Sequence, residues 1–145
     1  MTTEAVIVST ARTGVGKAYR GALNNTEGPT MAGHVMAEAV KRAGIAPGEV
    51  EDVVMGCAMQ QGTMVMNVAR KGAIRAGLPV TVAGTTIDRQ CASGLQAIAL
   101  AARSVIFDGV ENRGRRRRVD LAGAERQDQY VSCPGSGASQ DQGRG

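Results

Sequence analysis

Apolar and polar positions in residues 1–110 follow two alternating periods. Short runs rich in β-branched residues predict buried strands, and longer segments with apolar residues three and four apart predict helices. The predicted strands are Ala5–Thr10, Val50–Met59 and Val80–Asp88. The predicted helices are Thr30–Gly44, Met66–Gly77 and Ala92–Gly109. This β-α-β-α-β-α order predicts an α/β domain with helices packed on a parallel or mixed sheet.

The first and third predicted helices differ in how much of their surface is apolar. The apolar face of the first consists of Met31, Val35, Ala39 and Val40, and its polar face of His34, Glu38, Lys41 and Arg42. The third helix is apolar nearly all round, with Leu95, Ile98, Leu100, Val105, Ile106 and many alanines. A helix of that kind is expected to be buried in the centre of a domain.

Residues 111–145 break this pattern and form a second region. They hold seven Arg and no Lys, and only Val119, Leu121 and Val131 supply large aliphatic side chains. Such a segment buries too little apolar surface to offset the entropy lost on ordering. We therefore expect a partial domain over 1–110 and a disordered, Arg-rich tail over 111–145.

Composition narrows the class of protein. With one Phe, two Tyr and no Trp in 145 residues, the core must be built from Ala, Val, Ile, Leu and Met. Three cysteines without paired spacing argue against a disulfide framework, and the start lacks the pattern of a secretory signal. No apolar run approaches the ~20 residues of a membrane span. These features indicate a reducing compartment, most simply the cytoplasm. The net charge of +4 is mild and by itself indicates no class of partner.

The chemistry of the sequence centres on Cys91, which stands between the third strand and the third helix in "DRQCASG". Unpaired backbone N–H groups and the positive end of the dipole at a helix N-terminus favour a thiolate, the nucleophilic form. A tight strand-to-helix turn presents the sulfur outward, and the small residues 92–94 leave room for an acyl substrate. The alternative on local physics is a buried, inert cysteine, which is the commoner state of a lone cysteine.

Other candidate signals carry less chemistry. "GVGK" (Gly14–Lys17) lacks the full spacing of a phosphate-binding loop, and no Cys/His spacing fits a metal site. Cys57 is expected in the core, and Cys133 belongs to no motif. His34, the single histidine, is expected in solvent on a polar helix face.

The segment "DRQCASGLQAI" resembles the nucleophile motif of thiolases, an Asn-x-x-Cys-x-Ser-Gly-type sequence that opens a central buried helix. Asp88 stands where Asn is common, and "RTGVG" (residues 12–16) stands where the family has Arg-Thr-Pro-Ile-Gly. Further segments agree in order and spacing: "EAVIVSTARTGVGKAYRGAL", "EVEDVVMGCAMQQG" and "NVARKGAIRAGLP". The resemblance covers residues 4–111 and is strongest to the bacterial acetyl-CoA acetyltransferase/acyltransferase branch.

The resemblance implies an incomplete thiolase-type N-terminal domain and an acyl-CoA thiolase function. Cys91 would carry an acyl group as a thioester, for Claisen condensation or for thiolysis of a 3-ketoacyl-CoA. Coenzyme A thioesters would be the substrates, with no cofactor, metal or membrane partner. Homo-oligomers are implied only for full-length members. The strand that thiolases place after Gly109 is expected to be missing, which would leave a sheet position unfilled.

The family also uses residues that this chain does not contain. These are a Gly-His-Pro histidine that activates the nucleophile, a second cysteine in a Cys-x-Gly motif, and an Asn-Glu-Ala-Phe segment at the oxyanion hole. We therefore expect the 145-residue chain alone to be inactive. A non-catalytic pseudogene product is the competing interpretation.

The Arg-rich tail has two further interpretations. "RGRRRR" is typical of basic nucleic-acid-binding arms, although five acidic residues accompany it and no aromatic residue is near the run. The other interpretation is a frameshift: codons permitted for "NRGRRRRVDLAGAERQDQ", read one base later, allow "IAVGGGESISLVQNDK", a thiolase-like continuation. We hypothesise a one-nucleotide insertion near the codons of Glu111 and Asn112. Resequencing the locus tests it, because a shifted frame without a downstream thiolase sequence would refute it.

Overall fold

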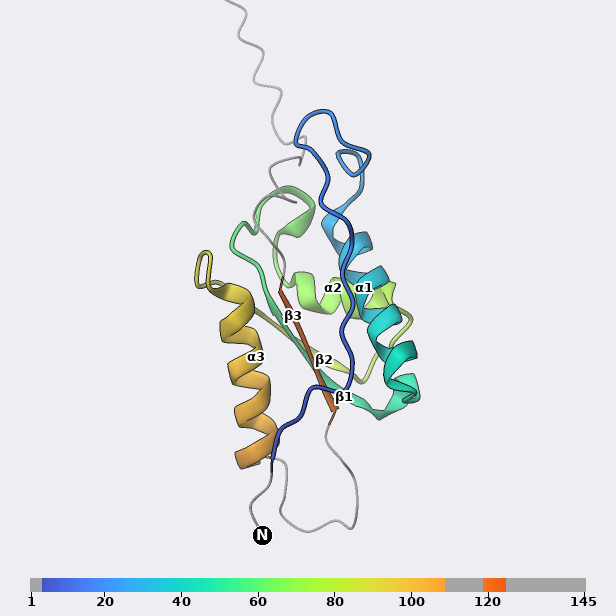
Figure 1. The fold of residues 1–145 in the computed structure, drawn as a ribbon, viewed down its shortest axis with the longest axis vertical. Coiled ribbons are helices and arrows are strands. Elements are labelled where there is room, and N and C mark those ends of the chain that lie inside the picture. Colours follow the sequence, from blue (N-terminus) through green and yellow to red (C-terminus); the bar gives the residue numbers. More distant parts are fainter. Residues whose placement is uncertain (1–3, 109–118, 125–145) are drawn as a thin grey trace, which may run out of the picture.

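The computed structural model of the protein describes residues 4–108 and 119–124, and Figure 1 shows their arrangement. The helices are α1 (Gly28–Ala43), α2 (Val68–Arg75) and α3 (Ser93–Arg103), and the strands are β1 (Val50–Gly56), β2 (Ala83–Ile87) and β3 (Val119–Ala124). Short 3-10 turns are Pro47–Glu49 and Gly62–Met64, and a π-helical turn, Ser104–Asp108, extends α3. All three predicted helices and the second and third predicted strands are therefore confirmed, with shifted ends.

The three described strands form a sheet in the order β2-β1-β3, and both pairings are parallel. In the centre of the sheet, Val54 of β1 lies opposite Thr85 of β2 and Ala122 of β3. Parallel neighbours need crossover connections, and α2 lies in the connection from β1 to β2. The predicted α/β class is confirmed. The sheet was expected to be parallel or mixed, and the described strands form a parallel sheet.

The predicted strand Ala5–Thr10 is not formed. Its central side chains, Val6–Val8, are 65–76% exposed, and the segment runs beside α1 (Figure 1), where Ser9 Oγ donates to Ala39 O over 2.8 Å. A strand has two edges, and β1 pairs with β2 on one and with β3 on the other. The prediction is wrong: a β-branched run does not form a strand by itself, and this one makes its described hydrogen bonds to α1, where Arg42 Nη1 also donates to Thr10 O (2.8 Å).

A strand inside the Arg-rich region corrects a second expectation. Val119–Ala124 forms β3 and pairs with β1, so the sheet position that we expected to be unfilled is occupied. A strand edge presents a row of N–H and C=O groups with which another backbone can pair whatever its side chains, so a segment poor in aliphatic residues still pairs there. Residues 109–118 and 125–145 lie outside the described residues, and for them disorder and nucleic-acid binding stay predictions.

One face of the sheet is covered by α1 and α2. Alternate residues of a strand point to opposite faces, and Val53 and Met55 point to this side. They join a core cluster that consists of Ala32, Met36, Val40, Val50, Val53, Met55, Cys57, Met64, Val68, Ala69, Ala73, Leu78 and Val82. The two helices approach closely because Gly33 lies against Arg75, where a Cβ on Gly33 would be 2.6 Å from the Arg75 Cβ. We call this side the closed face.

The buried side of α1 is rotated from the predicted one. Its buried residues are Gly28, Pro29, Met31, Ala32, Gly33, Met36 and Val40. Val35 and Ala39, predicted on the buried face, are only half-buried. A Cβ on Gly72 of α2 would lie 3.0 Å from Ala32 Cβ and from Met36 Cε, so this stripe of α1 is turned toward α2. The pattern within α1 alone does not contain the position of that neighbour.

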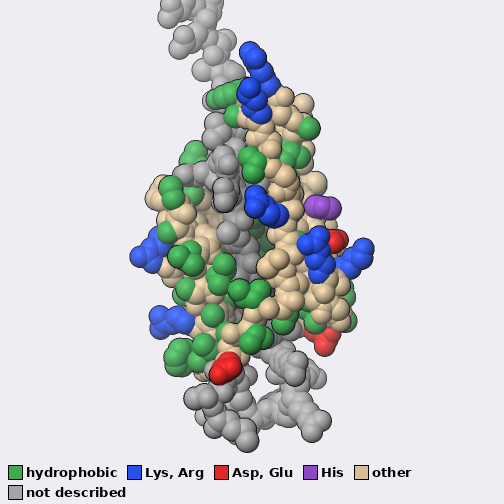
Figure 2. All heavy atoms as spheres, viewed as in Figure 1, with side chains coloured by type: hydrophobic (Ala, Val, Ile, Leu, Met, Phe, Trp, Pro, Cys, Tyr) green, Lys and Arg blue, Asp and Glu red, His purple; other side chains and the backbone are tan. Residues whose placement is uncertain are grey.

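The other face of the sheet is covered by α3, and we call it the open face. Val54 packs there against Ala97 and Ala101, with Ile87 beside them. The large side chains of α3 point outward, and Leu95 is 73% exposed. Figure 2 shows apolar side chains on the left, over α3, and across the lower part of the view. The expectation of a helix buried all round is wrong, because in the described residues nothing covers the outer side of α3.

The stretch Gln90–Phe107 is long and apolar enough, by length and composition, to cross a membrane. Its 18 residues have a mean hydropathy of 1.2, so the statement that no apolar run approaches a span needs correction. A core helix of a water-soluble protein passes the same test, and 17% of this stretch is buried here. Length and composition alone therefore do not distinguish a membrane-spanning helix from a helix that packs in the core of a domain.

Candidate active site at Cys91

Cys91 lies between the end of β2 at Ile87 and the start of α3 at Ser93, in a segment that we call the Cys91 turn (residues 88–93). The Cys91 side chain is exposed, whereas Ser93, two residues further on, is only 2% exposed. A strand-to-helix turn that presents the sulfur outward is what the sequence predicted. The alternative of a buried cysteine does not hold in this structure.

Three side-chain hydrogen bonds hold the Cys91 turn in shape. Asp88 Oδ1 accepts from the backbone N–H of Gln90 (2.9 Å), as in an Asx turn. Ser93 Oγ accepts from the backbone N–H of Arg89 (2.8 Å) and donates to the backbone carbonyl of Gln90 (2.6 Å). Gln90 has φ of 50°, in the left-handed region that non-glycine residues rarely adopt. The hydrogen bonds therefore surround one unfavourable backbone conformation, directly before the cysteine.

The end of β1 lies directly under the Cys91 turn. The Cys57 N–H donates to the Ile87 carbonyl (2.9 Å), which continues the pairing of β1 with β2 to the last residue before the turn. A Cβ on Gly56 would lie 2.3 Å from the Ser93 carbonyl carbon and 2.5 Å from the Gly94 nitrogen. No side chain fits in that space, so Gly56 lets the backbone of β1 touch the first turn of α3.

A second network fixes β2 against α2. Asn67 caps α2, because its Oδ1 accepts from the Arg70 N–H (3.1 Å), and its Nδ2 donates to Gly84 O (2.6 Å). Thr86 Oγ1 donates to Asn67 Oδ1 (2.9 Å), and the Arg70 guanidinium donates to Val80 O (2.7 Å). The strand that leads into the Cys91 turn is thereby held by the N-terminus of α2. The sequence contained a signal for this cap, an Asn directly before a helix, but not its partner on β2.

The remaining sequence-predicted residues lie away from the Cys91 turn. Cys57 is fully buried in the core, as predicted, and His34 is exposed on α1, as predicted. Because α1 and α3 cover opposite faces of the sheet, His34 and Cys91 are not brought together. Cys133 lies outside the described residues. Of the candidate site residues, the structure thus keeps Cys91. Ser93, expected only to leave room for substrate, is instead buried in the turn, and Gly56 is a neighbour that the sequence analysis did not single out.

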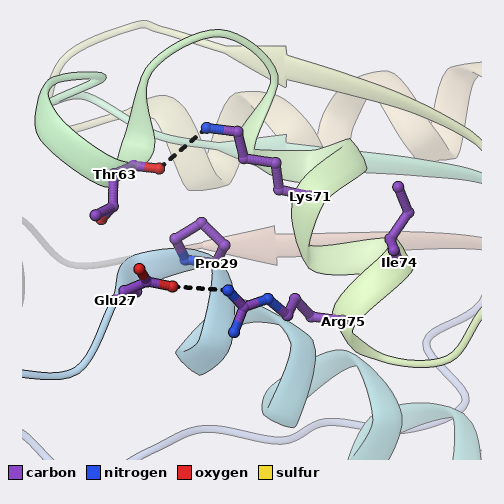
Figure 3. Close-up of a pocket in the computed structure, with 6 residues that line it drawn as sticks. All are labelled: Glu27, Pro29, Thr63, Lys71, Ile74 and Arg75. Atoms are coloured by element: carbon purple, nitrogen blue, oxygen red, sulfur yellow. Dashed lines mark hydrogen bonds and ion pairs between the residues drawn. The ribbon is translucent and has the colours of Figure 1, made fainter.

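A shallow pocket of about 370 Å³ lies elsewhere, between α1, α2 and the Gly62–Met64 turn (Figure 3). Its lining residues are Glu27, Pro29, Thr63, Lys71, Ile74 and Arg75. The two cations are already engaged: Lys71 Nζ donates to Thr63 O (3.2 Å), and Arg75 Nη2 pairs with a Glu27 carboxylate oxygen at 2.7 Å (Figure 3). No residue of the Cys91 turn lines this pocket, and we assign it no part in the chemistry.

Comparisons with known proteins match the segment that carries this site. The family model described as thiolase, N-terminal domain, matches residues 5–112. The 3-ketoacyl-CoA thiolase of Bacillus subtilis (strain 168) is 38% identical over 151 aligned residues, which cover 94% of this chain and 39% of the relative. The acetyl-CoA acetyltransferase of Cupriavidus necator is 42% identical over 109 residues, which cover 75% of this chain and 27% of the relative.

A solved structure gives the same result at the level of the fold. The crystal structure of the Bacillus anthracis acetyl-CoA acetyltransferase matches with a TM-score of 0.73 at 39% identity, over 85% of this chain and 29% of that one. The chain spans about two fifths or less of the length of these relatives. Sequence and fold agree over the same segment, and the chain therefore belongs to the thiolase family.

Proposed function

We propose that this protein acts as an acyl-CoA thiolase, a transferase for coenzyme A thioesters, with Cys91 as the nucleophile. The observation that carries the proposal is an exposed thiol at the N-terminus of an 11-residue helix, within the segment that matches the thiolase family. Reactive cysteines are commonly found in partly exposed positions at helix N-termini, and the exposed turn leaves the sulfur accessible to an acyl carbon.

The chemistry divides one reaction into two steps through a thioester on Cys91. In thiolysis, the sulfur attacks the C3 carbonyl of a 3-ketoacyl-CoA, and the bond between C2 and C3 breaks. Its electron pair leaves with acetyl-CoA, which takes up a proton. The acyl group then passes from Cys91 to the thiol of a second coenzyme A. Claisen condensation is the reverse sequence, so neither direction requires an oxidant, a metal or a further cofactor.

We further propose that the 145-residue chain alone does not complete this cycle. Proton transfers at the C2 carbon and at the coenzyme A thiol require an acid and a base beside the sulfur. The single histidine of the chain, His34, is exposed on the opposite side of the sheet from Cys91. The most that we expect of this chain is the first step, acylation of Cys91. A cytoplasmic location and homo-oligomers of full-length members belong to the same proposal.

Covalent labelling tests the first step. The chain is incubated with acetyl-CoA, digested and analysed by mass spectrometry, with Cys91→Ala as the control. We expect an acetyl group on the Cys91 peptide and not on the Cys57 or Cys133 peptides. Cys91 that iodoacetamide modifies but acetyl-CoA does not would contradict the proposed function.

Turnover is tested separately with acetoacetyl-CoA and coenzyme A. We expect the wild-type chain to give no more acetyl-CoA than Cys91→Ala does. Turnover that is present in the wild-type chain and lost in Cys91→Ala would contradict the proposed inactivity, while supporting the assignment of the nucleophile.

A further inference from the structure

We propose that Ser93 is a positioning residue for Cys91: its buried hydroxyl holds the Cys91 turn in the conformation that leaves the Cys91 side chain exposed directly before α3. The inference rests on the proposed role of Cys91 as a nucleophile and adds the device that orients it. Ser93 does not touch the substrate in this account and acts only through the backbone on either side of Cys91.

The geometry of the hydroxyl supports this role. Ser93 Oγ both accepts from the Arg89 N–H at 2.8 Å and donates to the Gln90 carbonyl at 2.6 Å. The two backbone groups precede Cys91, and Ser93 itself follows it, so one side chain ties together both sides of the cysteine. Among residues 4–107, whose side-chain burial is described, Ser93 is the one buried polar residue, with 2% of its surface exposed. The hydroxyl therefore acts as both a donor and an acceptor within the Cys91 turn.

The backbone between those two contacts explains why a tie is needed. Gln90 adopts φ of 50°, and left-handed backbone is unfavourable for residues with a Cβ. Without the ties from Ser93 and from Asp88, the segment is expected to relax toward ordinary backbone angles. Relaxation would move Cys91 away from the start of α3, where the N–H groups of the first helical turn lie.

The position of the Ser93 backbone is also fixed by its contact with β1. Gly56 at the end of β1 leaves no space for a Cβ, which would lie 2.3 Å from the Ser93 carbonyl carbon. The backbone of Ser93 therefore lies directly on the sheet, and the hydroxyl works from a rigid base. A displacement of about 1 Å in a reacting group is enough to cost about a hundredfold in rate.

The test measures the rate at which iodoacetamide alkylates Cys91 in the full 145-residue chain. This small neutral reagent needs no coenzyme A site, so the result does not depend on the proposed function. We expect Ser93→Ala to lower the rate by about tenfold, because the reactivity of a thiol depends on the groups around its sulfur. Ser104→Ala, in the π-helical turn that follows α3, is the control and is expected to leave the rate unchanged. Far-ultraviolet circular dichroism checks that the helix content is the same in both variants.

A rescue experiment separates positioning from a general loss of structure. Glycine adopts φ of about 50° without penalty, so Gln90→Gly removes the strain of the conformation that Ser93 holds. In a chain that already carries Gln90→Gly, we expect Ser93→Ala to change the alkylation rate by less than about threefold, because the strain that Ser93 counters is no longer there. An unchanged alkylation rate in a folded Ser93→Ala chain, or no rescue by Gln90→Gly, overturns the proposal.

Asp88 provides a second variant if Ser93→Ala does not fold. Asp88 is exposed, and its carboxylate makes the other tie to Gln90, at 2.9 Å. Asp88→Ala is expected to lower the alkylation rate of Cys91, and Asp88→Asn, which keeps the acceptor oxygen, to react faster than Asp88→Ala. Equal rates in the two Asp88 variants would also overturn the proposal. Acetyl transfer from acetyl-CoA is followed in parallel, and its absence in a wild-type chain that alkylates normally counts against the proposed function alone.

Discussion

The two faces of the sheet are built from the same strand but are finished differently. On the closed face, Val53 and Met55 of β1 meet large buried side chains from α2 and the Gly62–Met64 turn, such as Val68 and Met64. On the open face, Val54 of the same strand packs, among the described side chains, against Ala97 and Ala101 of α3 and against the partly buried Ile87. The closed face is a core with large side chains, whereas on the open face the described residues pack only small side chains against the sheet and leave Leu95 of α3 exposed.

This difference shows where stability and chemistry lie in the chain. Burial of large side chains supplies most of the stabilisation of a domain, and here it is concentrated on the closed face. The Cys91 turn belongs to the open face and is held by hydrogen bonds and close backbone contact rather than by large apolar side chains. The comparison makes four predictions, which run from the largest expected effect to the smallest.

The closed face should be the sensitive one. Met64 is fully buried, and we expect Met64→Ala to lower the free energy of unfolding by about 2–5 kcal/mol, or to unfold the chain, because it leaves a cavity. Met66, in the same loop, is 84% exposed, and Met66→Ala should change stability by less than about 0.5 kcal/mol. Urea denaturation measures both, and similar losses in the two variants would refute the contrast.

The junction between β1 and the Cys91 turn should be intermediate. Gly56→Ala forces a Cβ to within 2.3 Å of the Ser93 backbone, and we expect it to cost about 1–3 kcal/mol of unfolding free energy through overpacking. The matched control is Gly48→Ala, since a Cβ there meets nothing within 4 Å. A Gly56→Ala chain as stable as the Gly48→Ala chain would show that the close contact is not maintained in solution.

The open face should tolerate polar side chains on its outer side. Leu95 is 73% exposed, so Leu95→Gln should change the free energy of unfolding by less than about 0.5 kcal/mol. The same change should reduce self-association, because exposed apolar patches promote it, and light scattering measures that. Leu78→Gln, at a position 6% exposed on the closed face, should instead destabilise the chain. A strongly destabilised Leu95→Gln chain would mean that something covers α3 in solution.

The smallest effect should come from the outer surface of α1, on the closed side. Arg42 Nε donates to Glu38 Oε1 at 2.9 Å, and this hydrogen bond is the main cause that lowers the pKa of Glu38 below its ordinary value of 4.5. A lowered pKa contributes stability above the ordinary value, and that contribution is lost as the pH falls through the folded-state pKa. The pair is exposed and solvent-screened, so its contribution to stability should be small.

An NMR titration of Glu38 tests this prediction. Arg42→Ala should raise the midpoint toward 4.5, because both the hydrogen bond and the charge are lost. Lys41→Ala removes only a weaker charge interaction and should raise the midpoint less. A larger shift in Lys41→Ala than in Arg42→Ala would show that the hydrogen bond is not the main cause.

The helices show which features follow from nearby residues. Gly44, with φ of 67°, ends α1 where glycine was expected to stop it, and its N–H donates to Lys41 O. Asn67 begins α2, and the small residues after Cys91 begin α3. The same local pattern placed Cys91 at a strand-to-helix turn. Caps, periodicity and turn residues act over a few positions, and for that reason one sequence is enough to predict them.

The strands show what depends on distant parts of the chain. Ala5–Thr10 and Val50–Gly56 are both β-branched runs, yet only the second forms a strand, and the edge of β1 that β2 leaves open is paired with β3. The segment that won this position is part of a region that composition alone assigned to disorder. Pairing with a strand edge is a competition between segments far apart in sequence, and no local pattern records its outcome.

The sequence by itself thus determined the α/β class, the three helices, the position of Cys91 at the start of α3, and, through its motifs, the resemblance to thiolases. Only the tertiary structure decided which segments fill the sheet, which side of each helix is covered, and which residues support the Cys91 turn. Ser93 and Gly56 gain their roles from a contact between β1 and α3, almost forty positions apart along the chain. Local signals set the conformation of a residue, whereas burial and backbone contact depend on which distant segment lies against it.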